Sequence, residues 1–527
     1  MKKYLVTLLA AAALAACNDK NKGDDNSGTG SISDLVFVEN GVNYLGDGDQ
    51  HYRTPSGEYR LDAGKVYVLR GWVYIRKGSK LYIPAGTVIK GLKSNDVKGS
   101  SLIIEPGAQI FAEGTENAPV VFTSDRPAGQ RKPGDWGGVI ICGNAVNNKG
   151  SMQIEGGPTT VHGGTDNADN SGIFRYVRIE FAGYPFNTDQ EINGLTLGSV
   201  GSGTQVDHVQ VSYSNDDSFE FFGGAVDCKY LIAWHGWDDD FDTDNGFRGK
   251  LQFLLGVRHP KLADASCSNG FESDNNADAT NGAPYTEARF CNVTLVGPTG
   301  QDAGFINTAT TDGSDQSKYI NGGGLFPGNN SKLGQFQAGM QIRRNSHISV
   351  SNALVMGYPV GLIVEDDKVA GTQAYATANN TLQNIVFAGY TDNAAGTVYD
   401  NAAAGAAPIL GSDWNKGYRD SDGSYSGSTF TPGAGLSVSH GLALTNGCRV
   451  ATLADVMLPN AKSVIFSGSA WTVNTAQSYV PQGGSSLLGA FSVPVGFDAA
   501  GSGYIGAFGA TDWTANWTCF DPQNKAY

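Results

Sequence analysis

The sequence predicts an all-β fold, a right-handed parallel β-helix, and three observations support this. Leu81-x-Ile83-x-x-Gly86-x-x-Ile89 recurs 21 residues later as Leu102-x-Ile104-x-x-Gly107-x-x-Ile110. Glycine supplies 72 of 527 residues and charged residues only 17%, which favours many tight turns. Between residues 60 and 400, short apolar alternations replace the long period of amphipathic helices. These observations predict stacked coils of about 21 residues. A propeller has repeats of about 40 residues, and tandem sandwiches lack a 21-residue period.

Residues 1–16 predict a signal peptide. Lys2 and Lys3 form a charged start, an apolar stretch follows, and Leu14-Ala15-Ala16-Cys17 is a cleavage site of small residues ending in cysteine. Such a short apolar stretch does not span a bilayer. The site resembles the bacterial lipobox, in which Cys17 is acylated and becomes the mature N-terminus. A secretory signal that merely abuts a cysteine is the alternative.

Residues 17–33 predict a lipidated, flexible tether, because the segment is polar and rich in glycine, serine and aspartate. The mature chain is strongly acidic: its net charge of −15 becomes −17 once Lys2 and Lys3 leave with the leader. This charge repels phosphate backbones, so we expect no nucleic-acid partner.

Residues 34–400 predict the β-helix itself, with strand-like alternation at Val209-x-Val211-x-Tyr213 and Leu251-x-Phe253-x-Leu255. Residues 401–527 are rich in Gly, Ser and Ala and lose the period. We expect irregular last coils and a C-terminal cap there, because an open solenoid end invites pairing with another chain.

An acidic ladder is the main candidate site. Three segments align on a shared phenylalanine followed by a carboxylate: Phe219-Glu220, Phe241-Asp242 and Phe271-Glu272. If the phenylalanines stack inward, strand alternation sends the three carboxylates outward in one column. The next outward column then holds Phe222, Asp244 and Asp274. The steps are 22 and 30 residues, so the second coil contains a longer loop.

Later segments extend the alignment. They place Arg343 beyond Asp274 and Glu365 beyond Arg343, while Thr196 falls below Glu220. The predicted face is therefore acidic in its middle, with one cation at its edge.

Calcium is the ion we expect on this face, because adjacent carboxylates repel one another and Ca²⁺ accepts 6 to 8 oxygen ligands with flexible geometry. The predicted ligands are Asp242, Asp244, Glu272 and Asp274. Solvated turn residues are the alternative, and for Asp216 and Asp238, just before the strands, that interpretation is favoured.

The predicted ligand-binding residues are Glu220, Asp242, Glu272, Arg343 and Trp237. Trp237 is either a platform for a sugar ring or a packed core residue. His208 and His235 border the acidic segments without the HExxH spacing of a zinc site, and no G-x-S-x-G nucleophile elbow occurs.

Six cysteines remain after Cys17, an even number that permits disulfides in an exported chain. Cys267 with Cys291, and Cys448 with Cys519, are the first pairs to consider. Six cysteines allow 15 pairings, so the pattern stays open.

The chain resembles a family of right-handed β-helix lipoproteins of Bacteroidota, mostly of unassigned activity. The resemblance rests on Gly134-Asp135-Trp136-Gly137-Gly138, Asp217-Ser218-Phe219-Glu220, Asp238-Asp239-Asp240-Phe241-Asp242-Thr243-Asp244, Ser268-Asn269-Gly270-Phe271-Glu272-Ser273-Asp274 and Ile505-Gly506-Ala507-Phe508-Gly509. It covers most of the mature chain and implies a β-helix in the cell envelope. The acids after Cys17 also look like export signals of surface lipoproteins.

Two functions are compatible with these observations. The first is an outer-membrane, surface-exposed lipoprotein that binds a carbohydrate on its acidic, calcium-loaded face, as an accessory to uptake by a TonB-dependent transporter. The second is a calcium-assisted polysaccharide lyase, with Arg343 or less plausibly Arg248 removing a proton, or a glycoside hydrolase. Likeness of fold to β-helix pectinases is a weak basis for the second function.

Overall fold

The computed structural model describes residues 30–93, 99–187, 190–278, 280–302, 305, 323–327, 329, 331, 334–366, 368–388, 438–468 and 470–527. The predicted signal peptide, Cys17 and most of the tether lie outside these residues, as do residues 389–437. In the described part of the chain, no helix is long and apolar enough to cross a bilayer.

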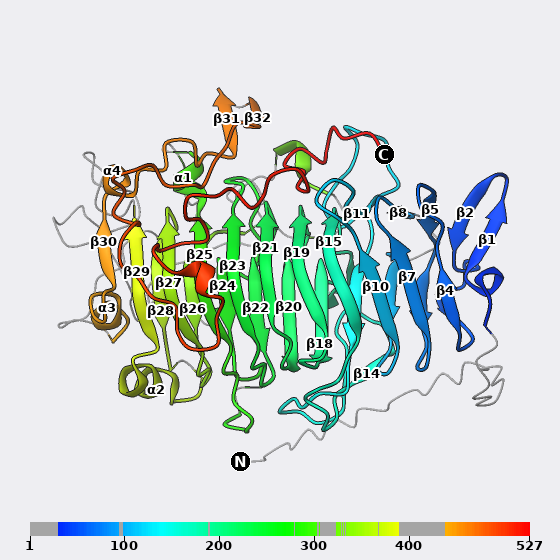
Figure 1. Ribbon diagram of the computed structural model, residues 1–527, viewed down its shortest axis with the longest axis horizontal. Helices are drawn as coiled ribbons and strands as arrows, with labels where there is room; N and C mark the ends of the chain where they lie inside the picture. Colours follow the sequence, from blue (N-terminus) through cyan, green and yellow to red (C-terminus); the bar gives the residue numbers. More distant parts are fainter. Residues whose placement is uncertain are drawn as a thin grey trace, which may run out of the picture.

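The protein is an elongated parallel β-helix whose strands stack coil upon coil, as predicted (Figure 1). Sheet I has ten parallel strands: β3 (His51–Arg53), β6 (Trp72–Ile75), β9 (Ser101–Ile104), β12 (Gly138–Cys142), β18 (Leu195–Val200), β20 (Phe219–Gly224), β22 (Phe241–Asp244), β24 (Phe271–Ser273), β26 (Ala338–Ile342) and β28 (Val360–Val364). Each pairs only with the same wall of the neighbouring coils, so residues far apart in the chain share one ladder.

Sheet II forms the other walls of the coil. Its main path is β1 (Val36–Glu39), β2 (Val42–Leu45), β5 (Val66–Leu69), β8 (Val88–Gly91), β11 (Val120–Ser124), β15 (Gly172–Glu180), β19 (Gln205–Ser212), β21 (Cys228–Trp234), β23 (Lys250–Val257), β25 (Arg289–Val296), β27 (Ser349–Met356), β29 (Leu382–Ala388) and β30 (Arg449–Ala451). A side branch, β4 (Glu58–Arg60), β7 (Lys80–Pro84) and β10 (Gln109–Glu113), joins at β15. The early coils therefore have three walls, and the long β15 merges two of them.

Several short elements lie outside the stacked walls of the coil. They are the pairs β13 (Met152–Gln153) with β14 (Val161–His162), β16 (Pro185–Asn187) with β17 (Gln190–Glu191) and β31 (Val464–Ser467) with β32 (Ala470–Val473); the helices α1 (Pro298–Gln301), α2 (Thr372–Asn379), α3 (Val438–Ala443) and α4 (Leu453–Val456); and the 3₁₀ turns η1 (Ile32–Asp34), η3 (Gly323–Leu325) and η6 (Ala499–Gly501). At the N-terminal end, β1 pairs antiparallel with β2 and covers the open edge of the first coil.

The repeated pattern that indicated the fold does not mark stacked residues. Leu81 of β7 pairs with Ile110, and Leu102 of β9 pairs with Val73, so the two copies lie on different walls. Both copies look alike because every wall alternates apolar residues and ends at a turn. The first coil nevertheless advances by the predicted 21 residues, since His51 pairs with Trp72.

A column of left-handed residues bends each long strand of sheet II at one level. Its members are Tyr176, His208, Tyr230, Phe253, Asn292, Asn352 and Asn384, whose φ angles lie between +48° and +60°. The aromatic members stack, with Tyr176 and Tyr230 each 4.3 Å from His208 by ring centroid. The asparagines tolerate this conformation and bond to one another, since Asn384 Nδ2 donates to Asn352 Oδ1 at 3.1 Å.

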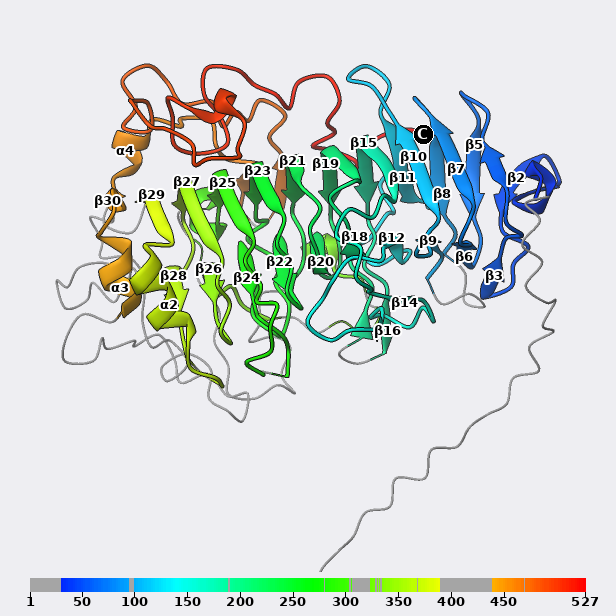
Figure 2. The same cartoon turned by 60° about the horizontal axis from the view of Figure 1, so that its bottom comes forward.

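The described part of the predicted cap takes a different course. β30 and α3 lie at the end of the coil, but the last residues run back along sheet II toward the N-terminal coils (Figure 2). Asn352 Nδ2 donates to the Ser492 carbonyl at 2.9 Å, and Gln210 Nε2 to the Cys519 carbonyl at 2.8 Å. Arg131 Nη1 reaches the Lys525 carbonyl at 2.8 Å. This tail therefore covers the side of the cylinder.

Candidate functional site

The acidic ladder lies on sheet I in the predicted register. Glu220 pairs with Asp242, and Asp242 with Glu272, while Phe219, Phe241 and Phe271 form the adjacent row. The three phenylalanines are buried in the core of the coil, and the Phe219 and Phe241 rings stack 5.3 Å apart. Strand alternation therefore sends the carboxylates to the outer side of the same strands.

The acidic stretch is the centre of a longer outer column. Toward the N-terminus the column continues through apolar Tyr74, Ile103 and Ile140 to Thr196, and toward the C-terminus through Gln341 to Ile363. Thr196 pairs with Glu220, as predicted. Apolar and neutral residues thus bracket three consecutive acids on one wall.

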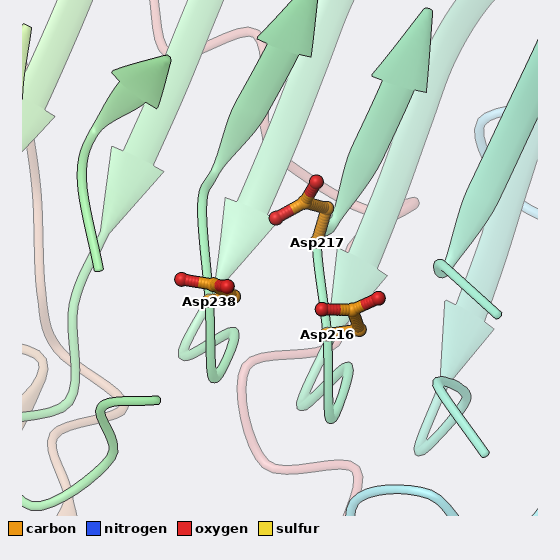
Figure 3. A group of neighbouring side chains, drawn as sticks. All are labelled: Asp216, Asp217 and Asp238. Carbon is orange, nitrogen blue, oxygen red and sulfur yellow. The ribbon is translucent and has the colours of Figure 1, made fainter. Parts of the chain in front are cut away.

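Seven acidic residues crowd this region, and their oxygens form three overlapping groups. In each group, three carboxylates offer oxygens within 4.8 Å of one another. The groups are Asp216, Asp217 and Asp238 (Figure 3); Asp217, Glu220 and Asp242; and Asp239, Asp242 and Glu272. Shared members make one continuous run of carboxylates from the loops before β20 and β22 onto the strands.

This run is more enclosed than an exposed face. Glu220 is 4% exposed, whereas Asp216, Asp238, Asp242 and Glu272 are half-buried. Strand alternation predicted only that the ladder residues point outward from the coil. Two insertions contact this side of sheet I: the first lies between β12 and β15 and carries β14, and the second lies between β25 and β26 and carries Ser331.

Two insertions make contacts on this side. His162 of β14 lies 6.5 Å from Phe222 by ring centroid, and Phe222 packs with Ile154. Asn215 Nδ2 donates to Ser331 Oγ at 2.7 Å, which connects the second insertion to the loop carrying Asp216. The half-buried Asp216 and Asp238 lie at the loop end of the carboxylate run.

Burial raises the pKa values of these acids. It raises the pKa of Glu220 and Asp242 well above the ordinary range, and the neighbouring carboxylates add to this effect. Burial, with repulsion from Asp264, raises the pKa of Asp238 to about 7. Burial also raises the pKa of Glu272 to about 7, although Arg343 opposes the shift. A cation among these oxygens would reverse this effect by favouring the charged forms.

Three acids in the run have an oxygen without a hydrogen-bond partner among the described residues. They are Glu220 Oε1, Asp238 Oδ1 and Asp242 Oδ1, and all three oxygens are buried. A buried acceptor without a donor is costly, and a hard divalent cation supplies the missing positive charge through oxygen coordination. The donor set is all oxygen, so it fits Ca²⁺ better than zinc.

The cation at the edge of the run is where the sequence predicted it. Arg343 Nε donates to Asp274 Oδ1 at 2.9 Å, and its Nη2 donates to Glu272. These two carboxylates raise the pKa of Arg343 further, although burial opposes them. The guanidinium is therefore held protonated and does not suit the role of a proton-abstracting base.

Arg344 is a second cation that sequence alternation missed. Its Nη1 donates to Asp274, alongside Arg343. Two consecutive residues of a regular strand point to opposite sides, but β26 ends at Ile342 and Arg344 has φ +48°. The sequence signal for this second contact was that two arginines, Arg343 and Arg344, are adjacent in the chain.

The predicted calcium ligands separate into two sets. Asp242 and Glu272 belong to the carboxylate groups, together with Asp217 and Asp239, which the prediction left out. Asp274 is occupied by the two arginines, and Asp244 Oδ1 accepts a hydrogen bond from the Asn245 amide at 2.5 Å.

Trp237 is not available as a sugar platform. It is fully buried, and its ring lies 6.0 Å from that of Phe326. Its carbonyl accepts hydrogen bonds from Arg258 Nη2 and Ser268 Oγ at 2.9 and 2.7 Å. The packed interpretation of Trp237 is the one that the structure supports.

The six cysteines of the mature chain after Cys17 are free thiols, and neither expected pair forms a disulfide. Cys228 and Cys291 lie on strands of sheet II that are separated by β23, and five of the six cysteines are buried. Cys448 and Cys519 are separated because the tail carries Cys519 back to β19.

Two family profiles match the chain. One is described as a pectate-lyase-like beta helix domain and matches residues 53–413, which is more than half of the chain. The other is described as a prokaryotic membrane lipoprotein lipid attachment site and matches residues 1–18, which include Cys17. Among curated proteins and solved structures, nothing matches.

Proposed function

The chain belongs to the family of pectate-lyase-like β-helix domains, and from this premise we propose that it is a lipid-anchored protein that binds divalent cations, Ca²⁺ in particular, along β20, β22 and β24. One observation carries the proposal. Asp217, Glu220 and Asp242 place carboxylate oxygens within 4.8 Å of one another, and the buried Glu220 Oε1 has no hydrogen-bond partner in the described part of the chain.

The proposed ligands are Asp217, Glu220, Asp239, Asp242 and Glu272. Charge balance supports the assignment. The five acids lie close together, and Glu272 is the member of the five that pairs with Arg343. The bound ion supplies positive charge. The protein's own residues hold its oxygen donors at fixed spacing, because Glu220, Asp242 and Glu272 are consecutive rungs of one ladder, and Asp217 and Asp239 lie in the loops just before β20 and β22.

The ligand that we propose for the charged face is a carbohydrate. Asp216 and Asp238 form its half-buried loop end, where a bound cation would meet the hydroxyl or carboxylate oxygens of a sugar. The lipid attachment site supports a location on a membrane. We propose the outer membrane, the cell surface and a role beside a TonB-dependent transporter as the setting for capture.

A calcium-assisted polysaccharide lyase is the second candidate, favoured by the family match. In such an enzyme, Arg343 would position substrate or balance charge, because its two carboxylate partners keep it protonated. Proton abstraction would then need another group. The capture function requires no such group.

Calcium titration tests the cation site. The mature protein in detergent, stripped with EDTA, should bind Ca²⁺ by calorimetry, and its melting temperature should rise with added Ca²⁺. Asp242→Asn should abolish both responses, whereas Asp62→Asn, at an exposed aspartate paired with Lys65, should change neither. An unaltered Ca²⁺ response in Asp242→Asn contradicts the proposed site.

A glycan panel separates capture from catalysis. Retention of a glycan that requires Ca²⁺ and leaves its chain length unchanged supports capture. New unsaturated ends, detected by their absorbance with uronic-acid polymers, would instead support the lyase. If no polymer is retained or cleaved, the carbohydrate assignment is contradicted. The calcium result still stands in that case.

A further inference from the structure

A second polar cavity lies away from the carboxylate run, where the tail crosses sheet II. Its volume is about 480 Å³, within the usual range of small-molecule sites. Strand residues Phe290, Ser349, Ser351 and Gln383 line it together with Tyr375 of α2 and Phe497 of the tail. Three segments distant in the chain therefore build one concave surface.

The tail is firmly placed at this cavity. Lys229 Nζ contacts Asp498 Oδ2 at 2.9 Å, and the Asp498 amide donates to Gln252 Oε1 at 2.8 Å. Arg289 Nη2 donates to the Val495 carbonyl at 2.9 Å, and its guanidinium lies 5.0 Å from the Phe497 ring centroid. These contacts hold the tail residues that line the cavity.

Two arginines, Arg248 and Arg289, line the cavity against one acid, Glu287. The half-buried Arg248 makes no ion pair or side-chain hydrogen bond with any other described residue, so its donors remain available to a ligand. In a chain with a net charge of −15, such a cationic spot selects for an anionic group. A guanidinium binds carboxylate, sulfate or phosphate oxygens through two parallel donors.

The remaining walls suit a sugar ring. Tyr375 stacks on His347, with ring centroids 3.7 Å apart and planes 2° from parallel, and both rings line the cavity. Such rings offer rigid, apolar surface to the C–H face of a saccharide. Hydroxyls of Ser349, Ser351 and Thr381 add donors and acceptors for ring hydroxyls.

We propose that this cavity binds a saccharide of one or two rings that carries an anionic group, with Arg248 and Arg289 contacting the anion and Tyr375 the ring. The site requires no metal. It therefore extends the protein's binding capacity beyond the proposed cation site and is independent of it.

The test uses the mature protein in detergent, with EDTA throughout, so that the cation site contributes nothing. Methyl β-D-glucuronide, glucose 6-sulfate and glucose 6-phosphate are titrated by calorimetry against the neutral methyl β-D-glucoside. At least one anionic probe should bind about tenfold more tightly than the neutral one. The three probes distinguish carboxylate, sulfate and phosphate.

Variants assign the binding to the cavity. Arg248→Gln should weaken the anionic probe about tenfold, the loss of one charged contact. Tyr375→Ala should weaken every probe. Arg60→Gln, at a 62% exposed arginine on the early coils, should have no effect, and thermal unfolding should confirm that all variants are folded. Equal affinity for charged and neutral probes, unchanged binding in Arg248→Gln, or no binding below about 10 mM overturns the proposal.

Discussion

Glu220 and Asp242 are direct cross-strand neighbours in sheet I, and each carboxylate has one buried oxygen that no described residue hydrogen-bonds. Like charges directly opposite one another destabilise a sheet. The same pair therefore destabilises the sheet without a cation and chelates the ion when one is bound. Three predictions about stability follow from this arrangement and its surroundings.

Replacing one member of the pair should stabilise the metal-free protein. Glu220→Gln removes a charge that repels Asp242, so the free energy of unfolding in EDTA should rise by about 0.2–1 kcal/mol. Urea unfolding with and without Ca²⁺ measures it. In Ca²⁺ the ranking should reverse, with the variant less stable than the parent protein. A variant that is less stable in both buffers contradicts the repulsion.

The stability of the metal-free protein should fall as the pH rises. The pKa of Asp238, about 7 when folded, lies above its ordinary value of 3.8, so the folded state binds an extra proton. That contribution is complete below about pH 4 and lost as the pH rises through 7. Glu272 behaves in the same way, with a folded pKa of about 7 against 4.5.

The measurement is urea unfolding in EDTA between pH 4 and 8. Asp238→Asn should flatten the profile relative to the parent protein, and the comparison cancels contributions from groups elsewhere, such as the buried histidines. If stability changes with pH in the same way in Asp238→Asn and in the parent protein, Asp238 has the same pKa in the folded and unfolded states.

Arg343→Gln should destabilise the metal-free protein by roughly 3 kcal/mol, because it leaves Glu272 without its cation and Asp274 with only Arg344. Removing a cation also makes the site more negative, so the stabilisation by Ca²⁺ should increase. Thermal and urea unfolding in both buffers test this. The exposed Arg60→Gln is the matched control, with an expected change below about 0.5 kcal/mol.

All six thiols should react with Ellman's reagent after denaturation without a reductant. In the native protein the reaction should be slow, because burial raises the pKa of Cys291 to about 12 and that of Cys448 to about 11. The chain used should lack Cys17. A count of four or two after denaturation would reveal disulfides and contradict the structure.

Tyr527→Phe should detach the end of the tail. The Tyr527 hydroxyl donates to Glu180 Oε1 at 2.6 Å and accepts from Arg178 Nη2 at 3.0 Å. Glu180 is 1% exposed, so loss of this donor should cost about 1–3 kcal/mol. Proteolysis should cut the tail faster in this variant, whereas Tyr44→Phe, at a tyrosine of β2 that takes no part in these hydrogen bonds, should match the parent protein.

Much of the site was predictable because a parallel ladder preserves strand alternation. Once Phe219, Phe241 and Phe271 are aligned, the positions of Glu220, Asp242, Glu272 and the cation Arg343 follow from a period of two. The same reasoning wrongly stacked the two copies of the 21-residue repeat. Leu81 and Leu102 occupy the same position in the pattern, but their strands belong to different walls of the coil. Pattern alone does not identify which wall a strand joins.

The sequence by itself determined the β-helix, the lipid attachment site and the order of residues along the acidic column, because these depend on local alternation and short motifs. Tertiary structure alone decided that insertions enclose the carboxylates, that Arg344 joins Arg343 on Asp274, and that the tail returns along sheet II to build a cavity. These features join residues far apart in the chain: Asp274 and Arg344 are 70 positions apart, and Arg289 and Val495 are 206 positions apart. Such contacts depend on how loops and the tail pack against the finished cylinder, and no short-range period encodes that packing.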